Sequence, residues 1–146
     1  MTPDVNVLVA ASRSDHPHHA MARGWLEEAV ETAQTTAPLA LQPMVTASFL
    51  RLVTHPKIFV HPTPVAEAMR FVDALLGMPG VSAPALGDEW PIFRALCVEK
   101  RLAANELPDA WLAAAVIHQG EHLVTFDRDF RRLLGRSQFT RLETSH

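Results

Sequence analysis

One strand of the chain is predicted to run directly into two acids, in the stretch Leu123-Val124-Thr125-Phe126-Asp127-Arg128-Asp129-Phe130. The residues from His122 to Phe126 are mostly apolar and follow Gly120, a pattern typical of a buried strand that comes after a helix. In an open α/β sheet, ligands bind at the carboxyl ends of the strands. We therefore expect the functional site to lie where this strand ends.

Two further acids stand at predicted element boundaries. Asp109 follows Pro108 at the expected start of a helix that runs to Gly120, and Asp4 precedes the apolar run from Val5 to Ala10. That run predicts a central strand buried on both faces, which would place Asp4 at the beginning of the strand and not at its carboxyl end. If the fold gathers these acids, a hard divalent cation is the ligand that best offsets their repulsion. The pattern predicts metal-dependent phosphodiester chemistry.

Predicted strands and helices alternate along the chain, which indicates a three-layer α/β/α sandwich with a central, mainly parallel sheet. Its length favours a single domain, residues 1–146. The further expected strands are Ala37 to Leu41, Val81 to Leu86 and Phe139 to Leu142; the further expected helices are one after Pro17, Met44 to Val53, Pro64 to Leu76 and Pro91 to Leu102.

The composition is that of a globular protein, with 48% hydrophobic and 20% charged residues. The single cysteine, Cys97, excludes an internal disulfide framework, fits a reducing cytoplasm and is expected to be a buried thiol. Asp4 stands where a signal peptide would carry basic residues, and the apolar run from Ala110 to Ile117 is too short to cross a bilayer. These features predict a cytoplasmic protein that does not enter a membrane.

The net charge of −3 argues against broad nonspecific binding of nucleic acid. Basic residues nevertheless gather close to Asp127 and Asp129 in the sequence, where five of the thirteen occur: Arg128, Arg131, Arg132, Arg136 and Arg141. This cluster is either a phosphate-facing patch or a solvated face. Arg128, Arg131 and Arg132 are the candidates for contact with RNA.

Four segments, taken in order and spacing, closely resemble the PIN-domain ribonuclease toxins of the VapC type: Asp4 to Ala10, Ser48 to Pro56, Pro108 to Ala114 and Leu123 to Phe130. The resemblance spans nearly the whole chain. It implies an α/β/α sandwich whose acids bind Mg²⁺ or Mn²⁺, and an enzyme that cuts RNA until a cognate antitoxin occupies its site. It also implies a homodimer, tRNA as the commonest class of target, and products with a 5′-phosphate and a 3′-hydroxyl.

The resemblance assigns roles to individual residues. Asp4, Asp109 and Asp127 match the inner, catalytic metal ligands, and Asp129 is a candidate outer ligand. Side chains that would orient these carboxylates are Asn6, Thr125 and Ser48.

One departure from the family pattern concerns a fourth acid. Many members carry it in the helix after the second strand, but this chain has no Asp or Glu between Glu31 and Glu67. The nearest polar candidates there are Thr46 and Ser48. We expect a site with three inner carboxylates, in which water completes the coordination of the metal.

Several alternatives stay open at this stage. Each aspartate taken alone is explained by a cap or a turn. Glu106 is an auxiliary ligand or a surface charge, and His16, His18 and His19 form a solvated helix cap or, less simply, a transition-metal site. The tryptophans favour core or interface packing over base stacking, and the apolar surface of Trp25, Phe71 and Leu75 offers contacts for a partner. The alternative function is a catalytically weak PIN-like module that binds RNA or an antitoxin.

Overall fold

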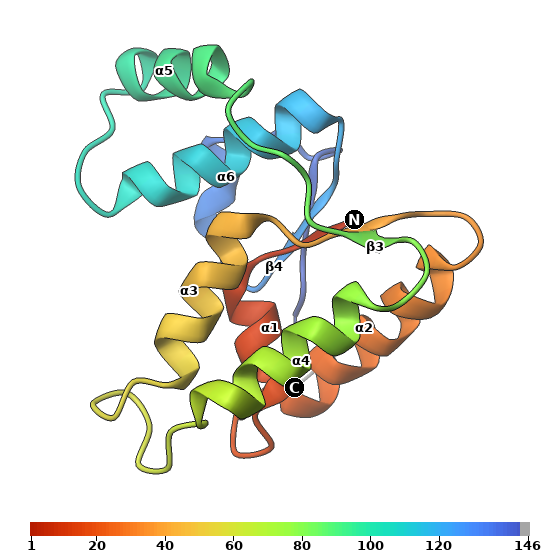
Figure 1. The fold of residues 1–146 in the computed structure, drawn as a ribbon. Coiled ribbons are helices and arrows are strands. Elements are labelled where there is room, and N and C mark those ends of the chain that lie inside the picture. Colours follow the sequence, from red (N-terminus) through yellow and green to blue (C-terminus); the bar gives the residue numbers. More distant parts are fainter. Residues whose placement is uncertain (144–146) are drawn as a thin grey trace.

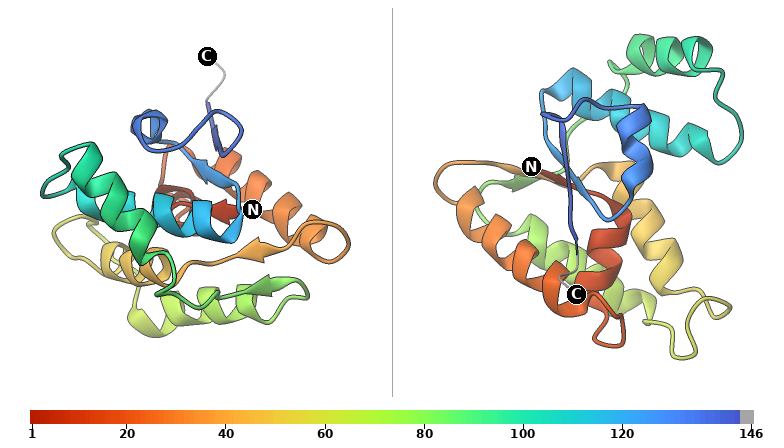
Figure 2. Two further views of the ribbon diagram at one scale, coloured as in Figure 1. Left: turned by 90° about the horizontal axis from the view of Figure 1, so that it is seen from above. Right: turned by 180° about the vertical axis from the view of Figure 1, so that it is seen from behind.

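Helices cover both faces of a parallel sheet in the computed structural model, which describes residues 1–143 (Figures 1 and 2). This arrangement confirms the predicted three-layer α/β/α fold class. Residues 144–146 of the predicted single domain lie outside the described part of the chain.

The strands form two parallel groups that meet at the amino terminus. Strands β1 (Thr2–Pro3), β4 (Leu123–Thr125) and β5 (Phe139–Arg141) pair in that order, and β2 (Leu39–Ala40) pairs with β3 (Val81–Ser82). The Ala40 N–H donates to the carbonyl of Met1 at 2.8 Å and so links the two groups. Because every pairing is parallel, the carboxyl ends of the strands share one edge.

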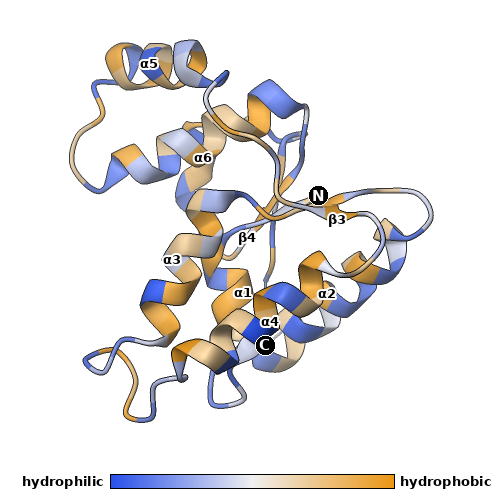
Figure 3. Cartoon of the chain, in the orientation of Figure 1, coloured by the Kyte–Doolittle hydropathy of each residue, from blue (hydrophilic) through white to orange (hydrophobic). Residues whose placement is uncertain are grey.

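The apolar run after Asp4 is a helix, α1 (Val5–Ser12), so the predicted strand there is wrong. A short continuous apolar run fits a buried helix as well as a buried strand, and its burial decides between them. Val7 and Ala10 are fully buried in the centre of the molecule, where α1 contacts the neighbouring helices α2 (His19–Ala33) and α3 (Pro43–Val53). Figure 3 shows the hydrophobic character of α1. The strand at the start of the chain is the short β1, which ends at Pro3. Asp4 therefore lies at the carboxyl end of a strand and not at the beginning of one, as had been predicted.

The remaining helices are close to their predicted positions. They are α4 (Val65–Leu76), α5 (Trp90–Glu99) and α6 (Glu106–Gln119). The short 3₁₀ helix η1 (Arg128–Arg132) was not predicted. Gly120 ends α6 in the left-handed conformation, at φ 64°. No helix within residues 1–143 is both long and apolar enough to span a membrane.

Some apolar side chains lie outside the buried core. Helix α4 buries Ala68 and Val72, whereas Val65 and Met69 are 59% and 44% exposed. Cys97, which was expected to be a buried thiol, is only half-buried and is not part of the core.

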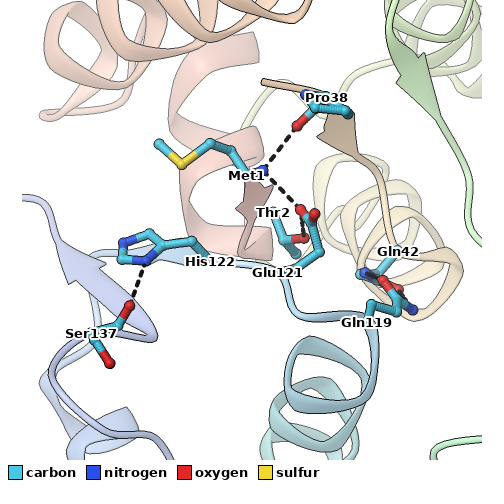
Figure 4. Close-up of polar contacts among 8 residues, drawn as sticks. All are labelled: Met1, Thr2, Pro38, Gln42, Gln119, Glu121, His122 and Ser137. Carbon is cyan, nitrogen blue, oxygen red and sulfur yellow. Dashed lines mark hydrogen bonds and ion pairs between the residues drawn. The ribbon is translucent and has the colours of Figure 1, made fainter. Parts of the chain in front are cut away.

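The amino ends of the strands are held together by polar contacts (Figure 4). The Met1 amine donates to the Pro38 carbonyl at 2.9 Å and to the Glu121 carboxylate at 2.8 Å, and the Thr2 hydroxyl donates to the same carboxylate at 3.1 Å. His122 Nδ1 lies 3.1 Å from the Ser137 carbonyl. These contacts fix where β1, β2, β4 and β5 begin, and with that they align the opposite edge of the sheet.

Candidate active site

The Thr125 hydroxyl is the centre of a hydrogen-bond network at the carboxyl edge of the sheet. It donates to Asp4 Oδ2 at 2.7 Å and accepts from the Asp127 N–H at 2.9 Å and from Asn6 Nδ2 at 3.3 Å. Asn6 Oδ1 in turn accepts from the Phe126 N–H at 3.2 Å. Thr125 is fully buried at the end of β4, so this hydroxyl has a fixed position. It joins the segment after β1 to the segment after β4.

Asp4 is the most deeply buried of the predicted ligands, at 5% exposure. It caps the amino terminus of α1, where its Oδ1 accepts from the Val5 N–H at 2.7 Å. Burial raises the pKa of Asp4 above its usual value, hydrogen bonds from Thr125 and Val5 lower it, and the charge of Asp127 raises it further. The carboxylate is therefore held in place at an electrostatic cost.

Asp109 lies in the first turn of α6, three residues after the helix begins at Glu106, and it is half-buried. Burial, followed by repulsion from Asp4, Asp127 and Asp129, raises its pKa from 3.8 to about 6. The charges of these three acids therefore lie near enough to Asp109 to act on its carboxyl group.

Asp127 and Asp129 belong to the turn that starts η1. Asp127 Oδ1 accepts from the Asp129 N–H at 2.8 Å, and the Asp129 side chain is exposed. Asp129 borders a small hollow together with Asp109 and Glu106. Glu106 forms an ion pair of 2.9 Å with Arg132, which accounts for both side chains without a metal.

A cleft of about 770 Å³ opens over two of the acids, Asp4 and Asp109. Its opposite wall is α3, which contributes Ser48 and Arg51, and it does not include Thr46. The family resemblance led us to expect a fourth acid on this helix; Ser48 instead presents a neutral hydroxyl to the cleft. The sequence analysis did not identify Arg51 as a candidate, although it lies three residues after Ser48 and therefore on the same face of the helix.

The donor set suits a hard divalent cation, because it combines carboxylates that repel one another with a hydroxyl on the facing helix. Within residues 1–143, however, no three His, Cys, Asp or Glu side chains converge tightly enough to hold one ion as they stand. Within the same residues, His16, His18 and His19 do not form a metal-binding group either. The His18 ring instead stacks on the Phe126 ring, with 5.0 Å between the ring centroids. The carboxylate cluster is therefore looser than a closed metal site.

The sequence of the chain matches a known protein family. The sequence profile described as "PIN domain" matches residues 1–134. The chain belongs to the PIN-domain family. This PIN domain is 38% identical to Ribonuclease VapC31 of Mycobacterium tuberculosis over 130 residues, which cover 88% of this chain and 89% of the relative. It is also 38% identical to Ribonuclease VapC43 of the same species over 144 residues, which cover 98% and 92%. Its relatives are thus of the VapC type.

A solved structure supports the same fold. A chain from the crystal structure of VapBC2 from Rickettsia felis, bound to a DNA fragment from its promoter, aligns with a TM-score of 0.69 and 16% identity. The alignment covers 97% of this chain and 98% of the other.

Proposed function

We propose that this PIN domain is a divalent-metal-dependent endoribonuclease and the toxin of a toxin–antitoxin pair. The observation that carries the proposal is the position of the Thr125 hydroxyl, which hydrogen-bonds both the Asp4 carboxylate and the Asp127 N–H. Asp109 lies close enough for the charges of Asp4 and Asp127, together with burial, to raise its pKa. The names of the relatives, Ribonuclease VapC31 and Ribonuclease VapC43, support the reaction class.

The proposed inner ligands of Mg²⁺ or Mn²⁺ are Asp4, Asp109 and Asp127, with Asp129 as an outer ligand. Such an ion, when bound, would act as a Lewis acid: it would lower the pKa of a water molecule and neutralise negative charge on the phosphate. Thr125 and Asn6 orient the carboxylates, and Ser48 faces them across the cleft. The ordering of these side chains by the fold is the contribution of the protein to the reaction.

RNA is proposed to enter along the cleft, with its phosphates near basic side chains. Arg51 lines the cleft itself, and Arg128 and Arg131 are exposed on η1 beside Asp127. Arg132 was also predicted to contact RNA, but its ion pair with Glu106 makes it the weaker candidate. Structured RNA such as tRNA is the proposed target class.

The proposed partners are a cognate antitoxin and a second copy of the chain. The solved structural neighbour is itself a VapBC2 assembly, which supports an antitoxin. Phe71 and Leu75 line a hollow of about 460 Å³ between α2 and α4 and remain candidate contacts, while Trp25 packs against the core beside them.

A second candidate function is a catalytically weak module that binds RNA or the antitoxin. The absence of a tight carboxylate triad within residues 1–143, and of any acid on α3, favours it.

One experiment separates the two functions. The purified protein is incubated with structured RNAs and Mn²⁺ beside Asp4→Asn, and beside Asp73→Asn as a matched control on the exposed face of α4. The enzyme proposal expects cleavage by the parent and by Asp73→Asn, and none by Asp4→Asn. Equal cleavage by all three proteins would sink it, and binding of RNA without cleavage by any of them would favour the module.

A further inference from the structure

An aromatic pocket of about 320 Å³ lies between α5 and α6, defined by Trp90, Phe93, Trp111, Gly87 and Glu89. Trp90 and Trp111 are 60% and 40% exposed, so neither is packed in the core; the expected alternative, packing at an interface with another chain, stays a prediction. The rings of Trp90 and Phe93 lie 5.6 Å apart between centroids and are tilted by 43°. Broad aromatic faces are therefore open to a ligand.

The aromatic pocket adjoins the cleft over the acids. Phe93 and Trp111 line both cavities, and Asp109 is on the same helix as Trp111. Figure 1 shows α5 lying alongside α6, away from the sheet. A chain of nucleotides that crosses Asp4 and Asp109 has this pocket beside it.

We propose that the aromatic pocket binds one unpaired nucleobase of the RNA, next to the bond that is cut. This inference rests on the proposed ribonuclease function. Bases of single-stranded nucleic acid stack on exposed aromatic side chains, and the pocket volume falls within the usual range for small-ligand sites, about 300–1,000 Å³. The pocket thus sets which nucleotides can lie in the cleft.

Glu89 gives the pocket its shape and its charge. The residue is only 3% exposed, and both of its carboxylate oxygens accept from the Gly87 N–H, at 2.6 and 2.7 Å. This contact braces the turn that starts α5, in which Gly87 has a φ of 131°. The carboxylate repels phosphate, whereas Arg51 in the adjoining cleft attracts it. The aromatic pocket therefore suits a base and not a phosphate group.

The test measures binding of a fluorescein-labelled, single-stranded RNA that the parent cleaves with Mn²⁺, in metal-free buffer. A series of such RNAs carries one abasic nucleotide at successive positions. For the parent, removal of one particular base should weaken binding about 5- to 150-fold. Trp90→Ala should weaken binding of the intact RNA by a similar factor, and in that variant the same abasic substitution should cost nothing further. Trp90→Phe should restore most of the coupling.

A matched control is Val98→Ala, which removes an exposed apolar side chain of α5 outside the pocket. Parent-like coupling in Trp90→Ala would overturn the inference, and so would a change in sedimentation mass, because the indole would then serve an interface between protein chains. If cleavage still depends on Asp4 in either case, the ribonuclease proposal stands without the pocket. A parent that neither binds nor cleaves RNA would overturn both.

Discussion

Replacing Asp109 by asparagine should stabilise the metal-free protein at neutral pH, although it removes a proposed metal ligand. The pKa of Asp109 is raised from 3.8 to about 6 by burial and by the charges of the neighbouring acids. A shift of about 2 units corresponds to about 3 kcal/mol. Because the side chain is only half-buried, solvent screening reduces this to about 1–1.5 kcal/mol.

The sign follows from proton binding in the two states. Folded protein keeps the Asp109 proton to a higher pH than the unfolded chain does, so the free energy of unfolding decreases between about pH 4 and about pH 6. Above that window the full cost of the ionised carboxylate is present, and below it the cost is absent. Asparagine removes the charge and with it this part of the pH dependence.

The assay is thermal unfolding of the parent and Asp109→Asn, with Asp73→Asn as the exposed control on α4. In EDTA at about pH 7.5 the midpoint of Asp109→Asn should exceed that of the parent by about 3–5 °C, and near pH 4 the two should coincide. Saturating Mn²⁺ should raise the unfolding midpoint of the parent more than that of Asp109→Asn, and so cancel or reverse the difference between the two midpoints. A parent that is the more stable protein in EDTA at neutral pH, or an equal response of both proteins to Mn²⁺, would refute the reasoning.

Three further predictions concern other parts of the structure. Thr125→Val should keep the fold, because it preserves shape, but lower the cleavage rate by about 10-fold or more, while Thr125→Ser retains most activity; equal rates would show that the hydroxyl does not position the acids. Arg51→Gln should weaken RNA binding and reduce the slope of log affinity against log salt by about 1, and an unchanged slope would remove Arg51 from the phosphate path. Gly80→Ala should lower the free energy of unfolding by more than about 2 kcal/mol, because Gly80 has a φ of 79° and an added Cβ would overlap the Ala33 carbonyl. Gly24→Ala, in helix α2 with no atom close to the added Cβ, should raise the free energy of unfolding by up to about 1 kcal/mol. Denaturant titration of both variants measures these changes.

The sequence predicted the parallel sheet and the sandwich, because the apolar runs ending at Leu41 and Phe126 are bounded by turn and helix signals. It did not predict that Val5 to Ala10 is a helix. Asn6 is the single polar residue in this run, which is too short and too apolar for its periodicity to distinguish a helix from a strand, so only tertiary burial decides between them. The correction moves Asp4 to the carboxyl end of β1, where it belongs with the other acids.

The acids of the proposed site and two polar neighbours, Asn6 and Thr125, could be named from the sequence because each acid has an element boundary and a family motif beside it. The aromatic pocket and the role proposed for Arg51 could not be predicted. Trp90 and Trp111 look like members of apolar helical stripes, and only the outlying position of α5, which buries none of its residues within the described part of the chain, shows that their faces are open. Arg51 likewise gains its meaning from the cleft that α3 and α6 form between them.

The chemistry of the product ends tests the central claim most directly. RNA cut by the purified protein is analysed for its new termini, with Mg²⁺, with Mn²⁺ and with EDTA. If a metal held by Asp4, Asp109 and Asp127 activates water, cleavage requires Mg²⁺ or Mn²⁺ and leaves 5′-phosphate and 3′-hydroxyl ends. Cleavage that persists in EDTA and leaves 5′-hydroxyl and cyclic phosphate ends would contradict the account.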